Sequence, residues 1–211
     1  MKIDSIKVGS YAANCYIVSE NGRDCTVIDP GDEPEKIIAK LKTLGLIPAM
    51  ILLTHGHPDH IGGVKALMEA YPGAKLYYGA GEEEVIRWSG KTHPGDVSSD
   101  LPEYIITNGT ALSDREEVSG AGLTFQVMAT PGHSRGCVVY IAGQDMFSGD
   151  TLFFEDIGRC DLFTSDYPEM LRTMKKLREL PGDYRIYPGH EQATTMDHER
   201  EFNPYLNGQH G

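Results

Sequence analysis

One short stretch of the chain holds four side chains of the kinds that bind divalent metal ions. They fall within six positions, directly after the apolar run Ile51-Leu52-Leu53, and they are His55, His57, Asp59 and His60. Imidazole nitrogens and carboxylate oxygens are the ligands that hard and borderline divalent ions prefer. A lone histidine is more often structural, but three histidines and an aspartate at this spacing predict a metal site.

Three further ligand-type residues stand in similar places. His133 in T-P-G-H-S, Asp150 in S-G-D-T and His190 in Y-P-G-H-E each follow a predicted strand and a turn of small residues. Functional side chains are common on such loops. Taken alone, Asp150 could equally be a turn-forming aspartate. Because seven ligands are too many for one tetrahedral ion, we expect two ions, roughly 3.5–4 Å apart, that share the Asp150 carboxylate.

Periodicity and turn signals predict the elements that carry these loops. Apolar runs and alternating patterns predict strands at residues 2–8, 13–18, 25–28, 49–53, 75–78, 123–129, 137–141 and 185–187. Helical spacing predicts helices between Asp32 and Gly45 and at residues 61–71, 82–88 and 168–180, with Asp32 and Asp166 as N-caps. Residues 89–103 show little periodicity and predict a surface loop. Strands and helices alternate similarly in both halves, which predicts a two-layer sheet core with helices outside.

The four cysteines give no sign of a disulfide framework. If Asn21-Gly22 forms a two-residue hairpin turn, Cys15 pairs with Ile28 and Cys25 pairs with Val18. The two thiols then lie on opposite faces of the hairpin. We therefore expect reduced cysteines and a cytoplasmic protein.

The chain has 211 residues, and we expect residues 1–211 to form one domain with a buried core. Its formal net charge of −12 argues against nucleic acid or an anionic membrane as a partner. The N-terminal residues mix Lys and Asp with apolar residues, and no apolar run reaches the length of a membrane span. We therefore expect neither a signal peptide nor a transmembrane segment.

Five motifs, in this order, resemble those of the metallo-β-lactamase fold superfamily: V-I-D-P-G, T-H-G-H-P-D-H, P-G-H-S, S-G-D-T-L-F and P-G-H-E. The resemblance covers nearly the whole chain. It implies an α/β fold, namely a four-layer αββα sandwich of two similar halves with the metals at one edge of the sheets. It is more specific for this fold than for one reaction.

The resemblance also implies a role for each matching residue. His55, His57 and His133 would hold the first metal ion, and Asp59, His60 and His190 would hold the second. Asp150 would bridge the two ions, and Asp29 would orient ligands from beneath the metal loop. The cofactor would be two divalent ions, with zinc expected first and iron or manganese as alternatives.

Within this superfamily the chain is most similar to glyoxalase II and its shorter relatives. The G-D-T-L-F segment, the P-G-H-E turn and the E-R-E-F-N-P-Y-L tail carry this resemblance. Two departures favour the short form. Residues 155–161 replace a glycine- and aromatic-rich stretch, and little chain follows His190 to form the helical domain that binds glutathione. The sequence therefore does not identify glutathione as part of the substrate.

The implied activity is that of a thioesterase of the hydroxyacylglutathione hydrolase type. Two ions that share a water would lower its pKa toward neutrality, so that hydroxide, oriented by Asp59, attacks a thioester carbonyl. The partner would be a small-molecule thioester. The carboxylate at Asp150 argues against antibiotic hydrolysis, because β-lactamases of this fold lack the bridging aspartate.

Three other functions fit parts of the pattern. A persulfide dioxygenase of the same fold, with a G-R-x-D stretch, would use one iron held by His55 or His57, His133 and Asp150. A lactone or ester hydrolase would use the same attacking hydroxide, and a metal-stabilised scaffold would not be catalytic. Arg159 is the expected contact for a substrate carboxylate, and its alternative role is an ion pair with Asp156 or Asp161.

Overall fold

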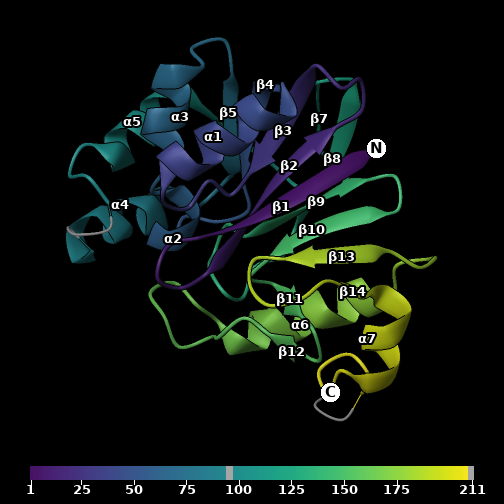
Figure 1. Ribbon diagram of the computed structural model, residues 1–211. Coiled ribbons are helices and arrows are strands. Elements are labelled where there is room, and N and C mark those ends of the chain that lie inside the picture. The colour runs from purple at the N-terminus through teal and green to yellow at the C-terminus, as the bar shows by residue number, and fades with distance from the viewer. Residues whose placement is uncertain (94–96, 209–211) are drawn as a thin grey trace.

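Two six-stranded sheets face each other at the centre of the molecule (Figure 1). The structure is a computed structural model that describes residues 1–93 and 97–208. The first sheet contains, in spatial order, β1 (Lys2–Val8), β2 (Ala13–Ser19), β3 (Asp24–Ile28), β4 (Ile47–Leu53), β5 (Lys75–Gly79) and β6 (Gly109–Leu112). The second contains β14 (Thr194–Thr195), β13 (Arg185–Pro188), β10 (Asp145–Gly149), β9 (Val138–Ala142), β8 (Leu123–Ala129) and β7 (Glu117–Gly120). A separate hairpin is formed by β11 (Leu152–Phe153) and β12 (Asp156–Ile157).

Helices cover the outer face of each sheet, which confirms the predicted αββα sandwich (Figure 1). The first sheet is covered by α1 (Pro34–Leu44), α3 (Val64–Ala70), α4 (Glu83–Thr92) and α5 (Leu101–Asn108). The second is covered by α6 (Tyr167–Arg178) and α7 (Met196–Phe202). Three apolar clusters fill the spaces between the four layers, and the one between the sheets contains Phe125, Tyr140 and Phe147. Burial of each such large side chain contributes about 1.5–3 kcal/mol to folding.

The predicted N-caps have different outcomes. Asp166 caps α6 as expected, because its carboxylate accepts a hydrogen bond from the backbone N of Glu169. The prediction that Asp32 caps α1 was wrong. Glu33 occupies the N-cap position with a φ of 46°, and the Asp32 carboxylate accepts a hydrogen bond from the backbone N of Glu33 instead. The C-terminal end of α1 lies at Gly45, which has a φ of 69° and matches the prediction.

The loop between β2 and β3 is longer than predicted, and this changes the register of the hairpin. Residues 20–23 form the loop, so Tyr16 rather than Cys15 pairs with Ile28. A shift of one residue moves every side chain to the other face. Cys15 and Cys25 consequently lie in the same apolar cluster, and their prediction on opposite faces was wrong. Both are free thiols, as are Cys137 and Cys160.

Two helical segments also differ from prediction. The helix expected at 61–71 is divided into α2 (Pro58–Ile61) and α3, because the backbone N of Gly63 donates to the carbonyl of Pro30 between them. The surface loop expected at 89–103 instead contains the end of α4 and the start of α5, and its residues 94–96 lie outside the described part of the chain. Buried Val97 and Leu101 anchor this segment in the core.

Within residues 1–93 and 97–208, no helix has the length and apolar character that a membrane span requires. That residues 1–211 form a single domain stays a prediction.

Candidate metal centre

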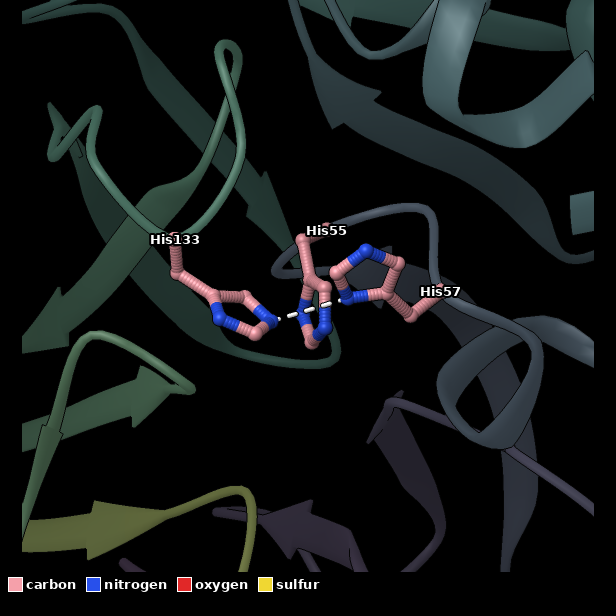
Figure 2. Close-up of side chains that lie close together, drawn as sticks. All are labelled: His55, His57 and His133. Carbon is pink, nitrogen blue, oxygen red and sulfur yellow. Dashed lines mark hydrogen bonds between the residues drawn. The ribbon is translucent and has the colours of Figure 1, made fainter. Parts of the chain in front are cut away.

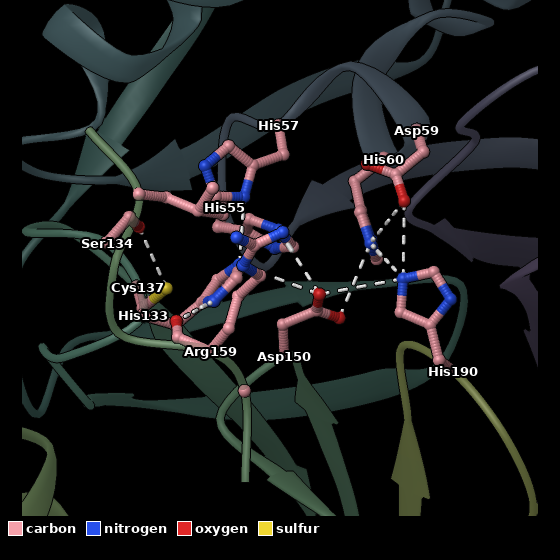
Figure 3. Close-up of polar contacts among 12 residues, drawn as sticks. His55, His57, Asp59, His60, His133, Ser134, Cys137, Asp150, Arg159 and His190 are labelled. Carbon is pink, nitrogen blue, oxygen red and sulfur yellow. Dashed lines mark hydrogen bonds and ion pairs between the residues drawn. The ribbon is translucent and has the colours of Figure 1, made fainter. Parts of the chain in front are cut away.

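All seven predicted ligands meet at one end of the facing sheets (Figure 3). Each one lies on a loop or a short helix that follows the C-terminal end of a strand. They come from the segment after β4 (His55, His57), from α2 (Asp59, His60), from the loop between β8 and β9 (His133), and from the ends of β10 (Asp150) and β13 (His190).

The first group contains His55, His57 and His133, which point toward one another in Figure 2. One ligand atom of each lies within 4.8 Å of the others, and all three side chains are buried. Nδ1 of His57 faces Nε2 of His133 at 2.8 Å. Nδ1 of His133 lies 2.8 Å from the carbonyl oxygen of Arg159 and donates to it, so Nε2 is the atom left to bind an ion. These three residues could therefore hold one cation.

The second group contains Asp59, His60 and His190. Oδ2 of Asp59 lies 3.2 Å from Nε2 of His190 and 3.7 Å from Nε2 of His60. Nδ1 of His60 donates to Oδ2 of the buried Asp29 at 3.0 Å, which directs Nε2 toward the other ligands. Asp29 also accepts hydrogen bonds from the backbone N and the hydroxyl of Thr54, at 2.8 and 2.6 Å. Asp29 thus contacts both His60 and Thr54, and the orienting role that the resemblance implies for it stays a prediction.

Asp150 lies between the two groups. Its Oδ2 atom is 3.5 Å from Nε2 of His133 and 4.0 Å from Nε2 of His55. The other oxygen, Oδ1, is 3.4 Å from Nε2 of His60, and Oδ2 is 3.5 Å from Nε2 of His190. One carboxylate therefore faces ligands of both groups, which is the position that a bridging ligand requires.

Two buried polar atoms support this interpretation. Nε2 of His55 and Oδ1 of Asp150 have no hydrogen-bond partner although both are buried. A buried polar group without a partner costs about 1–3 kcal/mol. A cation held by the two groups would interact with both atoms, so the described residues fit a metal centre.

The protonation states differ between the two groups. Burial lowers the pKa of His55 well below its usual value and lowers that of His57 to about 3, so both rings are neutral at pH 7. Burial also lowers the pKa of His60, but the carboxylates of Asp150 and Asp59 outweigh it and raise that pKa to about 10. The second group therefore attracts positive charge, which a divalent ion supplies more strongly than a proton.

Glu82, which the sequence did not single out, connects the two loops that carry the histidine group. Its Oε2 accepts a hydrogen bond from the backbone N of Gly56 at 2.7 Å. Its Oε1 accepts from the hydroxyl of Ser134 at 2.5 Å and from the backbone N of Gly136 at 2.7 Å. Burial raises the pKa of Glu82 to about 7, although these three donors lower it. In the sequence, Glu82 stands in an acidic run that is typical of an exposed helix start.

The turn that carries His190 is held by residues from β2, which the sequence also did not identify. The side-chain amide of Asn14 donates to the carbonyl of Pro188 at 3.0 Å, and the Tyr16 hydroxyl donates to the same carbonyl at 2.6 Å. Gly189 is required here, since a Cβ atom at this position would lie 2.2 Å from Oδ1 of Asp150.

A cavity of about 460 Å³ opens over the ligands, which is a size suited to a small molecule. Arg159 lines it, as expected for a substrate contact, but its guanidinium also forms a bidentate ion pair with Asp161, at 2.7 and 2.9 Å. The cavity also contains aromatic residues that sequence reasoning missed, among them Tyr11, Trp88 and Phe153.

The family model of the metallo-beta-lactamase superfamily matches residues 8–190 of this chain. The chain therefore belongs to the metallo-beta-lactamase superfamily. It is 31% identical to the hydroxyacylglutathione hydrolase GloC of Haemophilus influenzae, over 98% of this chain and 99% of that protein. It is 34% identical to the hydroxyacylglutathione hydrolase of Xanthomonas axonopodis pv. citri, over 83% of this chain and 59% of that protein.

Solved structures share the fold closely. BLEG-1, described as a B3 metallo-beta-lactamase, superposes with a TM-score of 0.86 and is 30% identical, covering 98% of this chain and 100% of that one. TTHA1623 in a di-iron-bound form gives a TM-score of 0.82 at 33% identity, covering 96% of this chain and 100% of that one. ETHE1 from Myxococcus xanthus gives 0.78 at 24% identity, covering 99% of this chain and 85% of that one, which shows a common fold.

Proposed function

We propose that this chain is a two-metal thioester hydrolase of the hydroxyacylglutathione hydrolase type. The observation that carries the proposal is the position of Asp150, whose carboxylate lies within 4.0 Å of ligands from both groups. A site for two ions with a shared carboxylate suits the activation of water for hydrolysis. The 31% identity with GloC over nearly the full length of both chains supports a thioester as the substrate.

Two divalent ions at this site, zinc or iron, would supply a nucleophilic hydroxide near pH 7 and polarise the substrate carbonyl. The remaining roles belong to the chain. His55, His57 and His133 offer neutral nitrogens because burial lowers the pKa of each ring. Asp59, as a ligand of the second group, carries a pKa that burial raises but that the neighbouring His60 lowers further, so it stays ionised and can orient the attacking hydroxide.

The leaving group explains why the cavity needs no strong general acid. Thioester cleavage releases a thiolate whose conjugate acid has a pKa of about 8.5, so it can leave unprotonated. Apart from the predicted ligands, the titratable residues lining the described cavity are the exposed or half-exposed Tyr11, His93, Asp156, Arg159 and Glu191. The four free thiols of the chain also suit the reducing cytoplasm in which we propose that it works.

The test compares thioesters, lactones, esters and a β-lactam on protein loaded with zinc, and separately with iron. We expect the thioesters to give the highest kcat/KM. The β-lactam belongs in the panel because BLEG-1 shares 30% of its sequence with this chain. If no thioester is cleaved while another class is, the proposed substrate is wrong and the metal site stands.

A persulfide dioxygenase is the second candidate, because the site also contains a set of two histidines and one carboxylate. Oδ2 of Asp150 lies 4.0 Å from His55 and 3.5 Å from His133, and this set resembles the iron site of non-haem oxygenases. Oxygen uptake on a glutathione persulfide by protein with one iron per chain would favour this function. Thioester turnover by protein with two ions per chain, without oxygen uptake, would exclude it.

A further inference from the structure

The wall of the cavity that lies beyond the metal ligands is mainly apolar. Its described residues include five with aromatic or aliphatic side chains, from segments far apart in the sequence: Tyr11, Trp88, Phe153, Ile157 and Leu162. Ligand cavities in proteins commonly combine such an apolar wall with a few polar groups that fix orientation. The apolar wall is thus suited to the part of a substrate that does not react.

An aromatic stack extends this wall to the surface. The rings of Trp88 and Phe163 stack at a centroid distance of 5.7 Å and an interplanar angle of 16°. Phe163 is 43% exposed and Tyr11, another residue of the wall, is 63% exposed. Large apolar side chains left in water beside a cavity commonly mark the place where an apolar ligand or partner binds.

The charged residues around the cavity also favour an uncharged ligand. Among its described lining residues, Arg159 alone carries a permanent positive charge, and Asp161 already neutralises it through two hydrogen bonds. Outside the predicted ligand set, the lining also contains two exposed carboxylates, Asp156 and Glu191. The thiol half of a glutathione thioester carries two carboxylates and one ammonium group, and its net negative charge would meet the like charges of Asp156 and Glu191 here.

We infer that this site selects thioesters whose acyl and thiol parts are uncharged and apolar, in preference to thioesters of glutathione. This inference rests on the proposed thioester hydrolysis and adds the class of substrate to it. The apolar wall, extended by Phe163 where that ring stacks on Trp88, binds the non-reacting part, while the carbonyl lies at the ligands. Water adds to the carbonyl carbon, the carbon–sulfur bond breaks, and the products are a carboxylate, a thiol and a proton.

The experiment measures kcat/KM for two thioesters with the same benzoyl group, one of N-acetylcysteamine, which is uncharged, and one of glutathione. We expect the uncharged thioester to be preferred by about tenfold or more, equivalent to about 1.4 kcal/mol. Equal values, or a preference for glutathione, would overturn the inference and leave thioester hydrolysis intact. Failure to cleave either thioester would instead contradict the proposed function.

Two variants test which residues cause the preference. Phe163→Ala should raise KM for the uncharged thioester several-fold with little change in kcat, because Phe163 acts in binding alone, and KM for the glutathione thioester should change less. Phe202→Ala is the matched control, since Phe202 is 51% exposed and its ring contacts His198, which does not line the cavity, whereas Phe163 stacks on the lining residue Trp88. Equal effects of Phe163→Ala on both thioesters would overturn the proposed role of the wall.

The second variant, Asp161→Asn, frees the guanidinium of Arg159 for a substrate carboxylate. We expect kcat/KM for the glutathione thioester to rise and that for the uncharged thioester to stay the same. Asp197→Asn removes the ion pair that another exposed aspartate makes with an arginine, Arg200, and serves as the control. A fall in kcat/KM for both thioesters in Asp161→Asn would show that the Asp161–Arg159 pair supports the site rather than neutralising it.

Discussion

Oδ2 of Asp29 accepts a hydrogen bond of 3.0 Å from Nδ1 of His60, deep beneath the second group of ligands. This hydrogen bond orients the ring so that Nε2 points toward Asp59 and His190, where it can bind an ion once its proton is lost. The same carboxylate binds Thr54, the residue before the first histidine ligand. Asp29 therefore connects the position of both groups to β3.

Asp29→Asn should weaken binding of the second ion about tenfold to 100-fold, the range found when such orienting carboxylates are removed. The amide would place an N–H group against the donors of Thr54 or His60. Titration with zinc against a competing chelator measures both affinities. Asp32→Asn, on the same loop, is the control and should change neither. An unchanged second affinity in Asp29→Asn would contradict the orienting role.

Binding of the two ions should release different numbers of protons. At pH 7, His55 and His57 are neutral, so filling their group releases few protons. His60, whose pKa lies at about 10, must lose a proton when the second group is filled. Affinity for the second ion should therefore rise with pH between 7 and 10, by about tenfold per unit for one proton.

Calorimetric titrations with zinc in two buffers of different ionisation enthalpy measure this proton release. The first binding event should show little dependence on the buffer, and the second should show release of at least one proton. If both events depend equally on the buffer, the assignment of protons to the two groups is wrong.

Glu82→Gln should lower the free energy of unfolding at pH 5 by about 1–3 kcal/mol. The side-chain NH₂ group of the glutamine would face backbone N–H groups whose hydrogen bonds the Glu82 carboxyl group accepts. The folded pKa of Glu82, about 7, lies above its usual value of 4.5. The contribution of Glu82 to the free energy of unfolding is therefore complete below pH 4.5 and is lost as pH rises through 7. The deficit of the variant should shrink between pH 5 and pH 8.

Urea unfolding of both proteins at pH 5 and pH 8 measures that difference. Glu69→Gln changes an exposed glutamate on α3 and should give the same deficit at both pH values. A deficit of Glu82→Gln that grows toward pH 8 would mean that the three donors, rather than burial, determine the ionisation of Glu82.

Asp59→Asn should remove the second ion and lower thioester turnover about 100-fold or more, beyond the cost of losing an orienting residue. The amide keeps the shape of the side chain but loses the charge that faces His190. Metal content and kcat are measured on the same sample. Asp100→Asn, which alters an ion pair between the exposed Asp100 and Lys65, should leave metal content and kcat unchanged. Full activity in Asp59→Asn with two ions bound would remove Asp59 from the mechanism.

The candidate ligands that meet in the structure could be identified from the sequence, because each lies in a short motif that combines its own strand end, turn and side chain. His133, Asp150 and His190 needed no knowledge of the fold to be recognised as candidates. Glu82 and Trp88 could not be found in this way, since their roles depend on contacts with loops about 50 and 75 residues away along the chain, such as Ser134 and Phe163.

The layered fold was predictable for similar reasons, and the errors of the prediction were local. Alternating and apolar runs placed most strands within a residue or two. The predicted β2–β3 register was wrong because the sequence does not reveal the hydrogen bonds that shape the loop. In these bonds, Oδ1 of Asn21 accepts from the backbone N of Arg23 and of Asp24. The prediction of a surface loop at 89–103 was wrong because the helices in this segment are stabilised by burial of a few residues against the first sheet rather than by their own periodicity.

In the proposed thioester hydrolysis, two ions act together through Asp150. A titration of metal-free protein with zinc tests this cooperation, with bound metal measured by elemental analysis and thioester turnover measured at each point. Turnover should stay low as the first ion binds and rise with occupancy of the second, to a maximum at two ions per chain. Full turnover at one ion per chain, or none at two, would contradict it.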